Sequence, residues 1–419
     1  MIKAVTGTKD ILPQEIVNWK HLESIVEEIF SNFNYKEIRT PVFEETSLFA
    51  RGIGEETDIV GKEMYTFIDR SEASLTLKPE MTASVVRAFI EHSLGKLQPL
   101  NKLYYISPMF RQERPQAGRQ RQFHQFGAEA LGSGSPLLDA EMIIIAYSIL
   151  QKLGLKDLSI KINSLGVPGS RESYKKILKD YLQNFKAQLS EDSARRFDTN
   201  ILRVFDSKVE TDQDILKSAP LLIDYIDDES KEHFEIVRDL LTKSNVPFEI
   251  DPKLVRGLDY YTKTTFEIVS GKVGSQSALC GGGRYDLLIE QLGGSSTPGV
   301  GFAAGIERIL LACENEKSFN LLPEQIDMYI VRLDKELTSV VYELALNFRS
   351  KNFTVEFDYL DRSIKAQMRE ANKLNARYVL FVGGDEYQAG KFNIKTMATG
   401  DQELIPVDNT DRIISIINK

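Results

Sequence analysis

Apolar residues recur every three or four positions in several segments of the chain, and this spacing predicts amphipathic helices. The first helix covers residues 13–33 and places Ile16, Trp19 and Leu22 on one face. The same pattern predicts further helices at 79–92, 139–152 and 303–313. Short apolar or alternating runs predict strands at 62–69, 74–77, 159–163, 264–269 and 277–280.

A further strand-like run at 35–44 is interrupted by Pro41. Proline has no amide proton to donate to a sheet ladder, so a strand that contains one is confined to an edge. We therefore expect this run at a sheet edge or at an interface.

Composition divides the chain into larger units. Residues 171–244 are charged, poor in glycine and helix-like, which indicates an inserted helical subdomain. Glycine-rich corners are expected at 281–284 and 293–294, and Pro323 marks the end of the unit that contains them. Beyond it, helices alternate with expected strands, which is typical of a small α/β domain with a mixed sheet. These strands are predicted at 328–332, 354–357 and 378–382.

Residues 110–129 combine four arginines and five glutamines between apolar flanks. The flanks predict two strands joined by a basic loop. The planar guanidinium group of arginine pairs with phosphate and carboxylate, so several arginines on one hairpin indicate an anionic ligand held over a sheet. A solvated hairpin tip is the alternative, but Glu113, Glu129 and the glutamines inside the strands favour the ligand.

Bulk composition limits the class of protein. A chain of 419 residues is expected to hold two or three domains, and its 42% hydrophobic and 27% charged residues are ordinary for a globular protein. No run is apolar enough to span a membrane, and no secretory pattern is seen at the N-terminus. Two cysteines and four histidines give neither a disulfide framework nor zinc-ligand spacing, so a cytoplasmic location is expected. The net charge of -9 argues against general coating of nucleic acid, but it permits a local basic surface.

The familiar catalytic motifs are missing from the sequence. The segment 281–285 has neither the spacing of a dinucleotide-binding loop nor the lysine of a phosphate-binding loop. No serine is framed by glycines, and His124 lies among strand aromatics, so covalent catalysis by the protein is not expected. Arginines and carboxylates on separated segments remain, and this mixture suits a polyphosphate bound beside a cationic small molecule. They are Arg111, Arg114, Arg119, Arg121, Arg256, Arg308, Glu80, Glu113, Glu129 and Asp259.

Several segments carry a resemblance to a known family. Thr40-Pro41 with the helix before it, residues 110–123 and residues 299–308 resemble the three motifs of class II aminoacyl-tRNA synthetases. Residues 254–261 and 281–286 are similar to motifs specific to the histidyl-tRNA synthetase family. The resemblance covers essentially the full length of the chain.

The resemblance implies an α+β fold with two domains. Residues 1–325 would form a class II catalytic core, in which helices flank an antiparallel sheet, with a helical insertion at about 168–250. Residues 326–419 would form an α/β anticodon-binding domain. The implied reaction is ATP-dependent ligation of L-histidine to tRNA(His) through histidyl-adenylate, with release of AMP and pyrophosphate and help from Mg2+. The first motif implies a homodimer, and no membrane partner is expected.

The resemblance also implies a role for individual residues. Arg111 and Arg256 would be the catalytic pair, contacting the histidine carboxylate and the α-phosphate. The expected ATP-binding residues are Arg111, Glu113, Phe123 and Arg308. The expected histidine-binding residues are Glu80, Met81, Thr82, Arg111, Gln125, Glu129, Arg256, Tyr260 and Tyr261. The expected tRNA-binding residues are Arg114, Gln116, Arg119, Arg121, Lys365, Arg369 and Lys373, and no metal ligand is assigned. Met81 and Leu287 stand where many members have glycine, a departure that concerns local backbone shape.

Other interpretations remain open at this point. Basic residues at intervals of three and four along 362–377 form a stripe that favours RNA contact, although a solvated helix face would show the same pattern. A non-catalytic synthetase-like regulatory subunit of histidine biosynthesis is one alternative, but such proteins generally lack the anticodon domain and the motif at 256–261. A class II synthetase for proline, threonine or glycine is another, and Glu80, Gln125 and Glu129 favour histidine over these.

Overall fold

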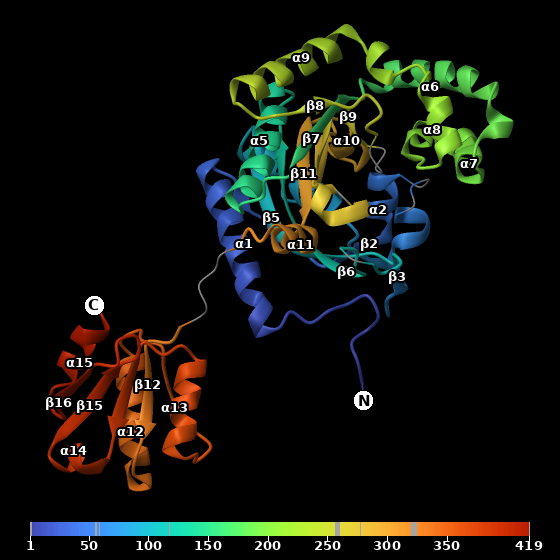
Figure 1. Cartoon of the computed structure of the whole chain (residues 1–419). Helices are drawn as coiled ribbons and strands as arrows, with labels where there is room; N and C mark the ends of the chain where they lie inside the picture. The colour runs from blue at the N-terminus through green and yellow to red at the C-terminus, as the bar shows by residue number, and fades with distance from the viewer. Residues whose placement is uncertain are drawn as a thin grey trace. The chain divides into compact units, whose positions relative to one another are not determined.

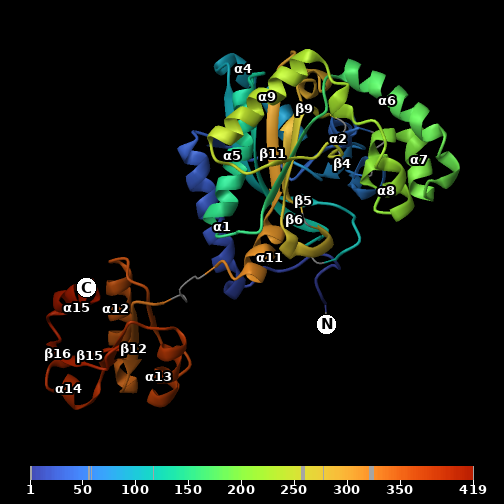
Figure 2. The same cartoon turned by 45° about the horizontal axis from the view of Figure 1, so that its top comes forward.

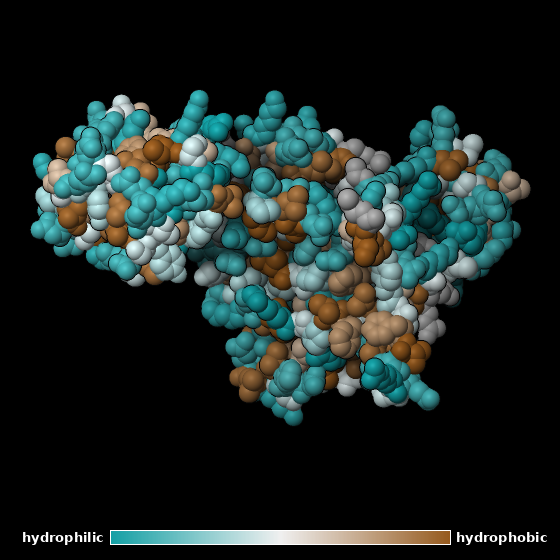
Figure 3. All heavy atoms as spheres, turned by 90° about the horizontal axis from the view of Figure 1, so that it is seen from below, coloured by the Kyte–Doolittle hydropathy of each residue, from teal (hydrophilic) through white to brown (hydrophobic). Residues whose placement is uncertain are grey.

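The chain folds into two units, Met1–Asn320 and Leu321–Lys419, which are described separately (Figures 1 and 2). The computed structural model describes residues 2–54, 57, 59–116, 118–255, 260–276, 278–319 and 325–418. Hydrophilic side chains cover much of the face seen in Figure 3, with apolar side chains in small groups between them. None of the helices in these ranges is both long and apolar enough to cross a lipid bilayer.

An eight-stranded sheet forms the centre of the first unit (Figure 1). Its order is β1-β5-β6-β11-β10-β9-β7-β8, with antiparallel pairing from β5 to β7 and parallel pairing of β1 and β8 at the two edges. This confirms the predicted antiparallel core. The strands are β1 Lys36–Glu37, β5 Asn101–Phe110, β6 Gln122–Leu131, β7 Ser159–Ser164, β8 Glu249–Ile250, β9 Thr262–Val269, β10 Ala278–Arg284 and β11 Gly299–Gly305.

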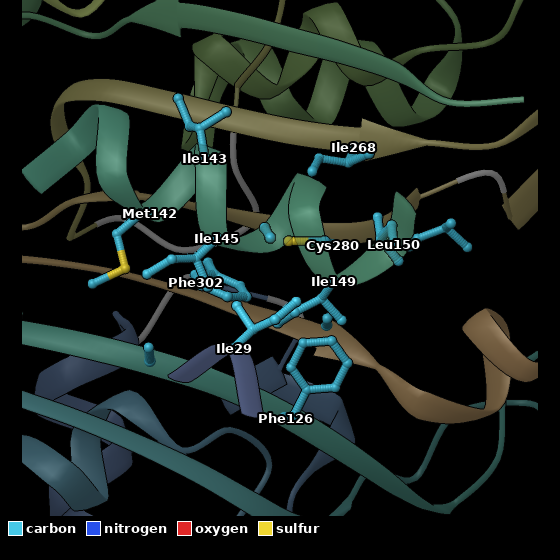
Figure 4. Packing of buried hydrophobic residues seen from close by; sticks show 14 of the residues in the cluster. Ile29, Phe126, Met142, Ile143, Ile145, Ile149, Leu150, Ile268, Cys280 and Phe302 are labelled. Carbon is cyan, nitrogen blue, oxygen red and sulfur yellow. The ribbon is translucent and has the colours of Figure 1, made fainter. Parts of the chain in front are cut away.

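Four helices bury the larger hydrophobic core against this sheet. They are α1 Pro13–Asn32, α5 Pro136–Lys152, α9 Asp228–Lys243 and α11 Ile306–Glu316. Figure 4 shows how Ile29 of α1, Ile149 of α5 and Phe302 of β11 meet in this core. Each of these side chains is almost fully removed from water, which typically contributes about 1.5–3 kcal/mol per side chain.

A second core contains α3 Thr82–Glu91, the tyrosines near residue 260 and an inserted group of helices. The inserted helices are α6 Pro168–Gln183, α7 Glu191–Thr199 and α8 Glu210–Leu216, and they lie together on the opposite side of the sheet from α1 (Figures 1 and 2). The predicted helical stretch at 171–244 is therefore divided between the two cores, because its last helix, α9, packs on α5 in the larger core.

A small three-stranded sheet, ordered β2-β4-β3, accompanies α3. Its strands are β2 Phe43–Glu45, β3 Tyr65–Ile68 and β4 Ser74–Leu77. The expected strand at 35–44 is thus split around Pro41 into β1 and β2, each at the edge of its own sheet. The remaining elements are α2 Thr46–Ile53, the π-helix Ile59–Glu63, α4 Leu94–Leu97, α10 Leu288–Gln291, and short 3-10 helices at Lys186–Gln188, Ile201–Asp206, Leu222–Asp224 and Gly271–Gln276.

Several predicted element boundaries are wrong. Gly281–Gly283 lie inside β10 and not at a corner, and residues 303–305 end β11 where a helix was expected. These glycines allow two backbones to approach, since a Cβ on Gly282 would lie 2.3 Å from the carbonyl oxygen of Gly301. The predicted strand at 62–69 begins only at Tyr65, because the π-helix occupies its first residues, and the helix predicted from Pro79 begins at Thr82.

The second unit is built on a five-stranded sheet ordered β13-β12-β14-β15-β16. β12 pairs parallel with β13 and β14, whereas β15 pairs antiparallel with β14 and β16, which confirms the predicted mixed sheet. Its strands are β12 Met328–Arg332, β13 Val355–Phe357, β14 Tyr378–Val382, β15 Lys391–Thr396 and β16 Gln402–Pro406. Its helices are a 3-10 turn at Lys335–Leu337, α12 Thr338–Arg349, α13 Ile364–Lys373, α14 Gly384–Gln388 and α15 Thr410–Ile417.

Candidate active site

A cavity of about 500 Å3 opens over the middle strands of the large sheet. Its walls come from the start of α3, the β5–β6 hairpin, β9, β10, β11 and the first turn of α11. Most of the residues predicted to bind small molecules meet here, although they lie far apart in the sequence. Those lining the cavity are Glu80, Met81, Thr82, Arg111, Glu113, Phe123, Gln125, Tyr260, Tyr261 and Arg308, and Arg119, predicted to bind tRNA, lines it as well.

Glu80 closes the N-terminus of α3 at one end of the cavity. Its carboxylate accepts hydrogen bonds from the backbone N–H groups of Thr82, at 2.8 Å, and Ala83, at 2.9 Å. These amides would otherwise lack partners at a helix start, so Glu80 is held firmly in place. Burial raises its pKa, while the two backbone hydrogen bonds and Arg111 oppose that shift.

Glu129, a predicted histidine-binding residue, is 1% exposed and is not among the residues that line the cavity, but it contacts Thr82 and Tyr285, which do line it. It accepts a hydrogen bond from the Thr82 hydroxyl at 2.8 Å and another from the hydroxyl of Tyr285. Gly301 leaves room for this carboxylate, because a Cβ there would lie 1.8 Å from Glu129 Oε2. Burial raises the pKa of Glu129 to about 8, and the neighbouring charge of Glu80 adds to the shift. A carboxyl group with a pKa of about 8 is thus buried behind Thr82, Tyr285 and Gly301, which line the cavity.

Gln125 presents a polar atom that the surrounding protein does not satisfy. It lines the cavity, and its buried Oε1 has no hydrogen-bond partner in the described part of the chain. A buried acceptor without a partner is unfavourable, so such an atom commonly marks a ligand position. The arrangement therefore suits a ligand that donates a hydrogen bond here.

Three tyrosines form an aromatic wall beside these polar groups. The ring centroids of Tyr260 and Tyr261 are 4.8 Å apart, and those of Tyr260 and Tyr285 are 5.7 Å apart. Burial raises the pKa values of Tyr260 and Tyr285 well above the usual range, so both hydroxyls remain donors. Together with Glu129 and Gln125, this wall can enclose a small ring that carries N–H groups.

Arginines gather at the other end of the cavity. Arg111 donates from Nε to the carbonyl oxygen of Pro79 at 2.9 Å, and its guanidinium carbon lies 5.3 Å from the centroid of the Phe123 ring. Glu113 pairs with Arg119 at 2.9 Å and with Arg111 at 3.7 Å. An anionic ligand could contact these cations, while Phe123 offers a flat apolar face for stacking.

Arg308, in the first turn of α11, completes the cationic end. It donates to the carbonyl oxygens of Gly118 at 2.9 Å and of Ala278 at 3.0 Å, and so ties the basic loop to β10. Burial lowers its pKa from the usual value, and the charge of Arg119 adds to this. Because the positive charges of Arg308 and Arg119 repel each other, binding of an anion beside them is favourable.

Some predicted residues lie elsewhere. Arg121 is turned to the protein, since its Nε donates to the carbonyl oxygen of Glu113 at 3.4 Å. Arg114 and Gln116 line a separate cavity of about 560 Å3, together with Lys62 and Glu63 of the π-helix. Arg256, the second predicted catalytic arginine, lies with Asp259 outside the described residues.

Sequence reasoning missed several residues at the cavity. Tyr285, Glu267, Gly301 and Lys208 all line it. Tyr285 and Gly301 lie within the motifs at 281–286 and 299–308 but were given no role, whereas Glu267 and Lys208 lie in no motif. His124 has the structural setting expected of it, with its ring nitrogen Nδ1 3.0 Å from Glu307 and its ring edge-on to Trp19 at 5.0 Å.

Arg284, within the same motif as Tyr285, serves the fold. Its fully buried guanidinium group pairs with Asp139 of α5, donates to the carbonyl oxygens of Ser133 and Ser135 at 3.1 Å each, and contacts Asp286 at 3.0 Å. It therefore anchors the start of α5 to β10, the strand that lines the cavity.

The predicted basic stripe of the second unit lies on α13. Lys365, Arg369 and Lys373 are exposed, and Lys373 lies 3.8 Å from Glu370. Arg362 and Arg377 are engaged within the unit, Arg362 with Asp358 and Arg377 with Asp327 at 3.1 Å. Gln367 and Ala371 face inward, so the stripe is narrower than the sequence suggested.

An antiparallel sheet that brings a basic hairpin, a capped helix start and a helix-borne arginine to one cavity has the design of a class II aminoacyl-tRNA synthetase. The family model described as histidyl-tRNA synthetase matches residues 7–309, and a model of an anticodon-binding domain matches residues 327–415. The chain belongs to the histidyl-tRNA synthetase family.

Individual relatives match over the whole length. Histidine–tRNA ligase of Caldanaerobacter subterraneus subsp. tengcongensis is 48% identical over 415 residues, which cover 99% of each chain. The enzyme of the same name from Geobacillus sp. (strain WCH70) is 48% identical over 405 residues, 96% of each chain. The crystal structure of apo histidyl-tRNA synthetase from S. aureus matches with a TM-score of 0.84 and 39% identity, covering 100% of both chains. Full-length similarity to ligases does not favour the regulatory-subunit alternative.

Proposed function

We propose that this protein joins L-histidine to tRNA(His) in two steps. In the first, the histidine carboxylate attacks the α-phosphorus of ATP, a phosphoanhydride bond breaks, and histidyl-adenylate and pyrophosphate form. In the second, a hydroxyl of the terminal tRNA ribose attacks the activated carbonyl, and AMP leaves. The observation that carries the proposal is the single cavity with a buried, hydrogen-bonding floor at one end and three arginines at the other.

The floor would bind histidine. Gln125 and Glu129 would meet the imidazole N–H groups, with Tyr260 and Tyr261 enclosing the ring. Glu80 and Thr82 would hold the amino group, and Met81 would contribute its backbone beside them. A site that bonds a ring N–H discriminates strongly against amino acids without one, because its own buried polar groups would remain unpaired.

The arginine end would bind ATP. Phe123 would stack on adenine with Glu113 near its amino group, Arg308 would reach the γ-phosphate, and Arg111 with Arg256 would bridge the carboxylate and the α-phosphate. No protein nucleophile takes part, so positioning and charge neutralisation supply the rate enhancement.

Mg2+ would enter with ATP. The described residues contain no cluster of three or more metal-ligating side chains, but four carboxylates line the cavity. Glu80 is hydrogen-bonded at the start of α3 and Glu307 to His124, which leaves Glu113 and Glu267 as the candidates to meet the ion. That fits Mg2+, which is commonly held by one or two carboxylates together with substrate phosphates, and which neutralises phosphate charge when bound.

Two basic surfaces would meet tRNA. The loop bearing Arg114, Gln116, Arg119 and Arg121 would contact the acceptor end, and Lys365, Arg369 and Lys373 would contact the anticodon region. This assigns catalysis to residues 1–325 and anticodon recognition to residues 326–419.

A homodimer in the cytoplasm would complete the description. Beside Thr40-Pro41, apolar side chains are unusually exposed on the small sheet, at 41% for Val42, 48% for Phe43 and 64% for Ile68. Exposed apolar groups of this kind fit a partner surface.

The test of the activity is ATP–pyrophosphate exchange measured with each of the twenty amino acids. We expect exchange with histidine alone, followed by histidine transfer to tRNA(His). Exchange with another amino acid, or with none, would refute the proposal.

A further inference from the structure

The inserted helical segment contributes one described residue to the wall of the active-site cavity, Lys208. All other described residues lining the cavity come from the large sheet, α3, the β5–β6 hairpin, α11 or the residues directly next to these elements. Lys208 lies between the 3-10 turn Ile201–Asp206 and α8. A long cationic side chain therefore reaches the site from a different part of the fold.

The backbone that carries Lys208 is held by a buried network. Asp212 has no exposed surface and accepts hydrogen bonds from the hydroxyls of Ser190 at 2.5 Å, Ser193 at 2.6 Å and Ser207 at 2.6 Å. The carbonyl oxygen of Ser207 also accepts from the side-chain amide of Gln213. Ser207 is thus fixed through both its hydroxyl and its carbonyl, immediately before Lys208.

The insertion is also tied directly to the histidine end of the cavity. Arg171 of α6 donates from a terminal guanidinium nitrogen to the carbonyl oxygen of Tyr261 at 2.6 Å. Tyr261 lines the cavity and follows the segment that carries Arg256. This bond fixes the insertion against the site that Lys208 enters.

Lys208 differs from the other cations of the cavity in its pairing. Arg111 and Arg119 share Glu113, and Arg308 is bonded to two carbonyl oxygens. Lys208 is exposed and has no ion pair with any residue in the ranges that the structure describes. An uncommitted ammonium group at a site for polyphosphate is suited to a phosphate oxygen.

We propose that Lys208 is a phosphate-contacting residue of the active site, supplied by the inserted segment and positioned by Ser207 and Asp212. The inference rests on the proposed function, which places two phosphate sources in this cavity. One is the triphosphate of ATP, and the other is the terminal phosphodiester of tRNA.

The test compares Lys208→Ala and Lys208→Arg with wild-type protein in two assays. One assay is histidine-dependent ATP–pyrophosphate exchange, and the other is single-turnover transfer from preformed adenylate to tRNA(His). Losing one charge-assisted hydrogen bond should slow the affected step by about 10- to 100-fold. Loss in the exchange assay identifies ATP, and loss in transfer alone identifies tRNA. Lys208→Arg should retain most of the rate in either case.

Lys217→Ala is the matched control, because Lys217 lies in the same insertion, is 70% exposed and pairs with Asp214 at 2.7 Å away from the cavity. It should leave both rates unchanged. Rates of Lys208→Ala within about 2-fold of wild type in both assays would overturn the proposal, because the loss of a charge-assisted hydrogen bond should cost more than that. The wild-type rate tests the proposed function and the ratio of variant to wild type tests Lys208, so the two can fail separately.

Ser207→Ala tests the positioning role. Removing the hydroxyl releases its hydrogen bond to Asp212 and the one it accepts from the backbone N–H of Val209 at 3.3 Å, which hold the backbone on both sides of Lys208, so the same step should slow. The Ser207→Ala, Lys208→Ala double variant should be no slower than Lys208→Ala, because both changes act through one ammonium group. Additive losses would show that Ser207 acts independently and would overturn this part of the proposal.

Discussion

Glu129→Gln should stabilise the first unit at high pH while weakening histidine binding. In the folded protein, burial raises the pKa of Glu129 to about 8, with Glu80 adding to the shift, whereas the unfolded chain has the ordinary carboxyl value. A raised carboxyl pKa means that the folded state holds its proton at pH values where the unfolded state has lost it. Stability from this group is therefore complete at low pH and is lost as pH rises toward about 8.

The magnitude follows from the linkage slope of about 1.36 kcal/mol per pH unit for one proton. Between pH 6.0 and 7.5, wild-type protein should lose roughly 2 kcal/mol of unfolding free energy that the neutral amide variant keeps. Thr82 and Tyr285 can satisfy an amide as well as a carboxyl group, because each hydroxyl both donates and accepts. The variant should consequently match protonated wild type in packing.

The assay is denaturant unfolding followed by tryptophan fluorescence at several pH values. Trp19 is the only tryptophan in the chain and is buried in the first unit, so its signal reports on the unit that holds Glu129. Glu290→Gln, at an exposed carboxylate on α10, should show no such pH dependence in its difference from wild type. A difference between Glu129→Gln and wild type that stays constant within about 0.5 kcal/mol would refute the linkage argument. In exchange assays at about pH 9, where wild-type Glu129 is ionised, the variant should raise KM for histidine at least about 10-fold by loss of a charged hydrogen-bond acceptor, and it should leave KM for ATP unchanged.

Three further predictions concern the site and the second unit. Gly301→Ala should destabilise the first unit by about 1–3 kcal/mol through overpacking and raise KM for histidine, because its Cβ would lie 1.8 Å from Glu129 Oε2. Thermal unfolding and exchange kinetics test this, and an unchanged KM would contradict it. Arg256→Ala should slow adenylate formation at least ~100-fold, as expected for loss of one transition-state donor. Near-normal pyrophosphate exchange would refute the catalytic role proposed for Arg256. Replacing both Lys365 and Arg369 by alanine should weaken tRNA binding and reduce its salt dependence by roughly one unit of slope per lost phosphate contact, with exchange unaffected.

Strand β6 of the predicted hairpin contributes side chains both to the cavity and to the larger core. Alternate residues of a strand point to opposite faces, so Phe123 and Gln125 line the cavity while Phe126 joins the larger core. The apolar flanks predicted the hairpin, but not which face each side chain would take, because apolar Phe123 shares the cavity face with polar Gln125. Helical spacing predicted α1 and α5 equally well, because each buries a broad apolar face.

Other parts of the site depend on contacts between distant segments. Lys208 reaches the cavity only because the insertion folds back onto the sheet, and nothing in its neighbouring residues signals this. Glu80 was expected to bind ligand, yet its first structural task is to cap α3, a contact that depends on where the helix begins. Such features follow from the tertiary fold and cannot be inferred from local pattern.

The glycines of β6, β10 and β11 explain why a corner was wrongly predicted at 281–284 and how the sheet makes room for polar groups. Locally, glycine suggests a turn, but here it supplies space inside paired strands. A Cβ on Gly127 would lie 2.5 Å from the Tyr105 hydroxyl oxygen, and one on Gly301 would meet the Glu129 carboxylate. Polar groups thus occupy the volume that side chains would fill between β6 and its neighbours. Because that volume is shielded from water, the Glu129 carboxyl becomes a weaker acid than usual, and the missing side chains of the sheet leave room for this polar group behind the cavity wall.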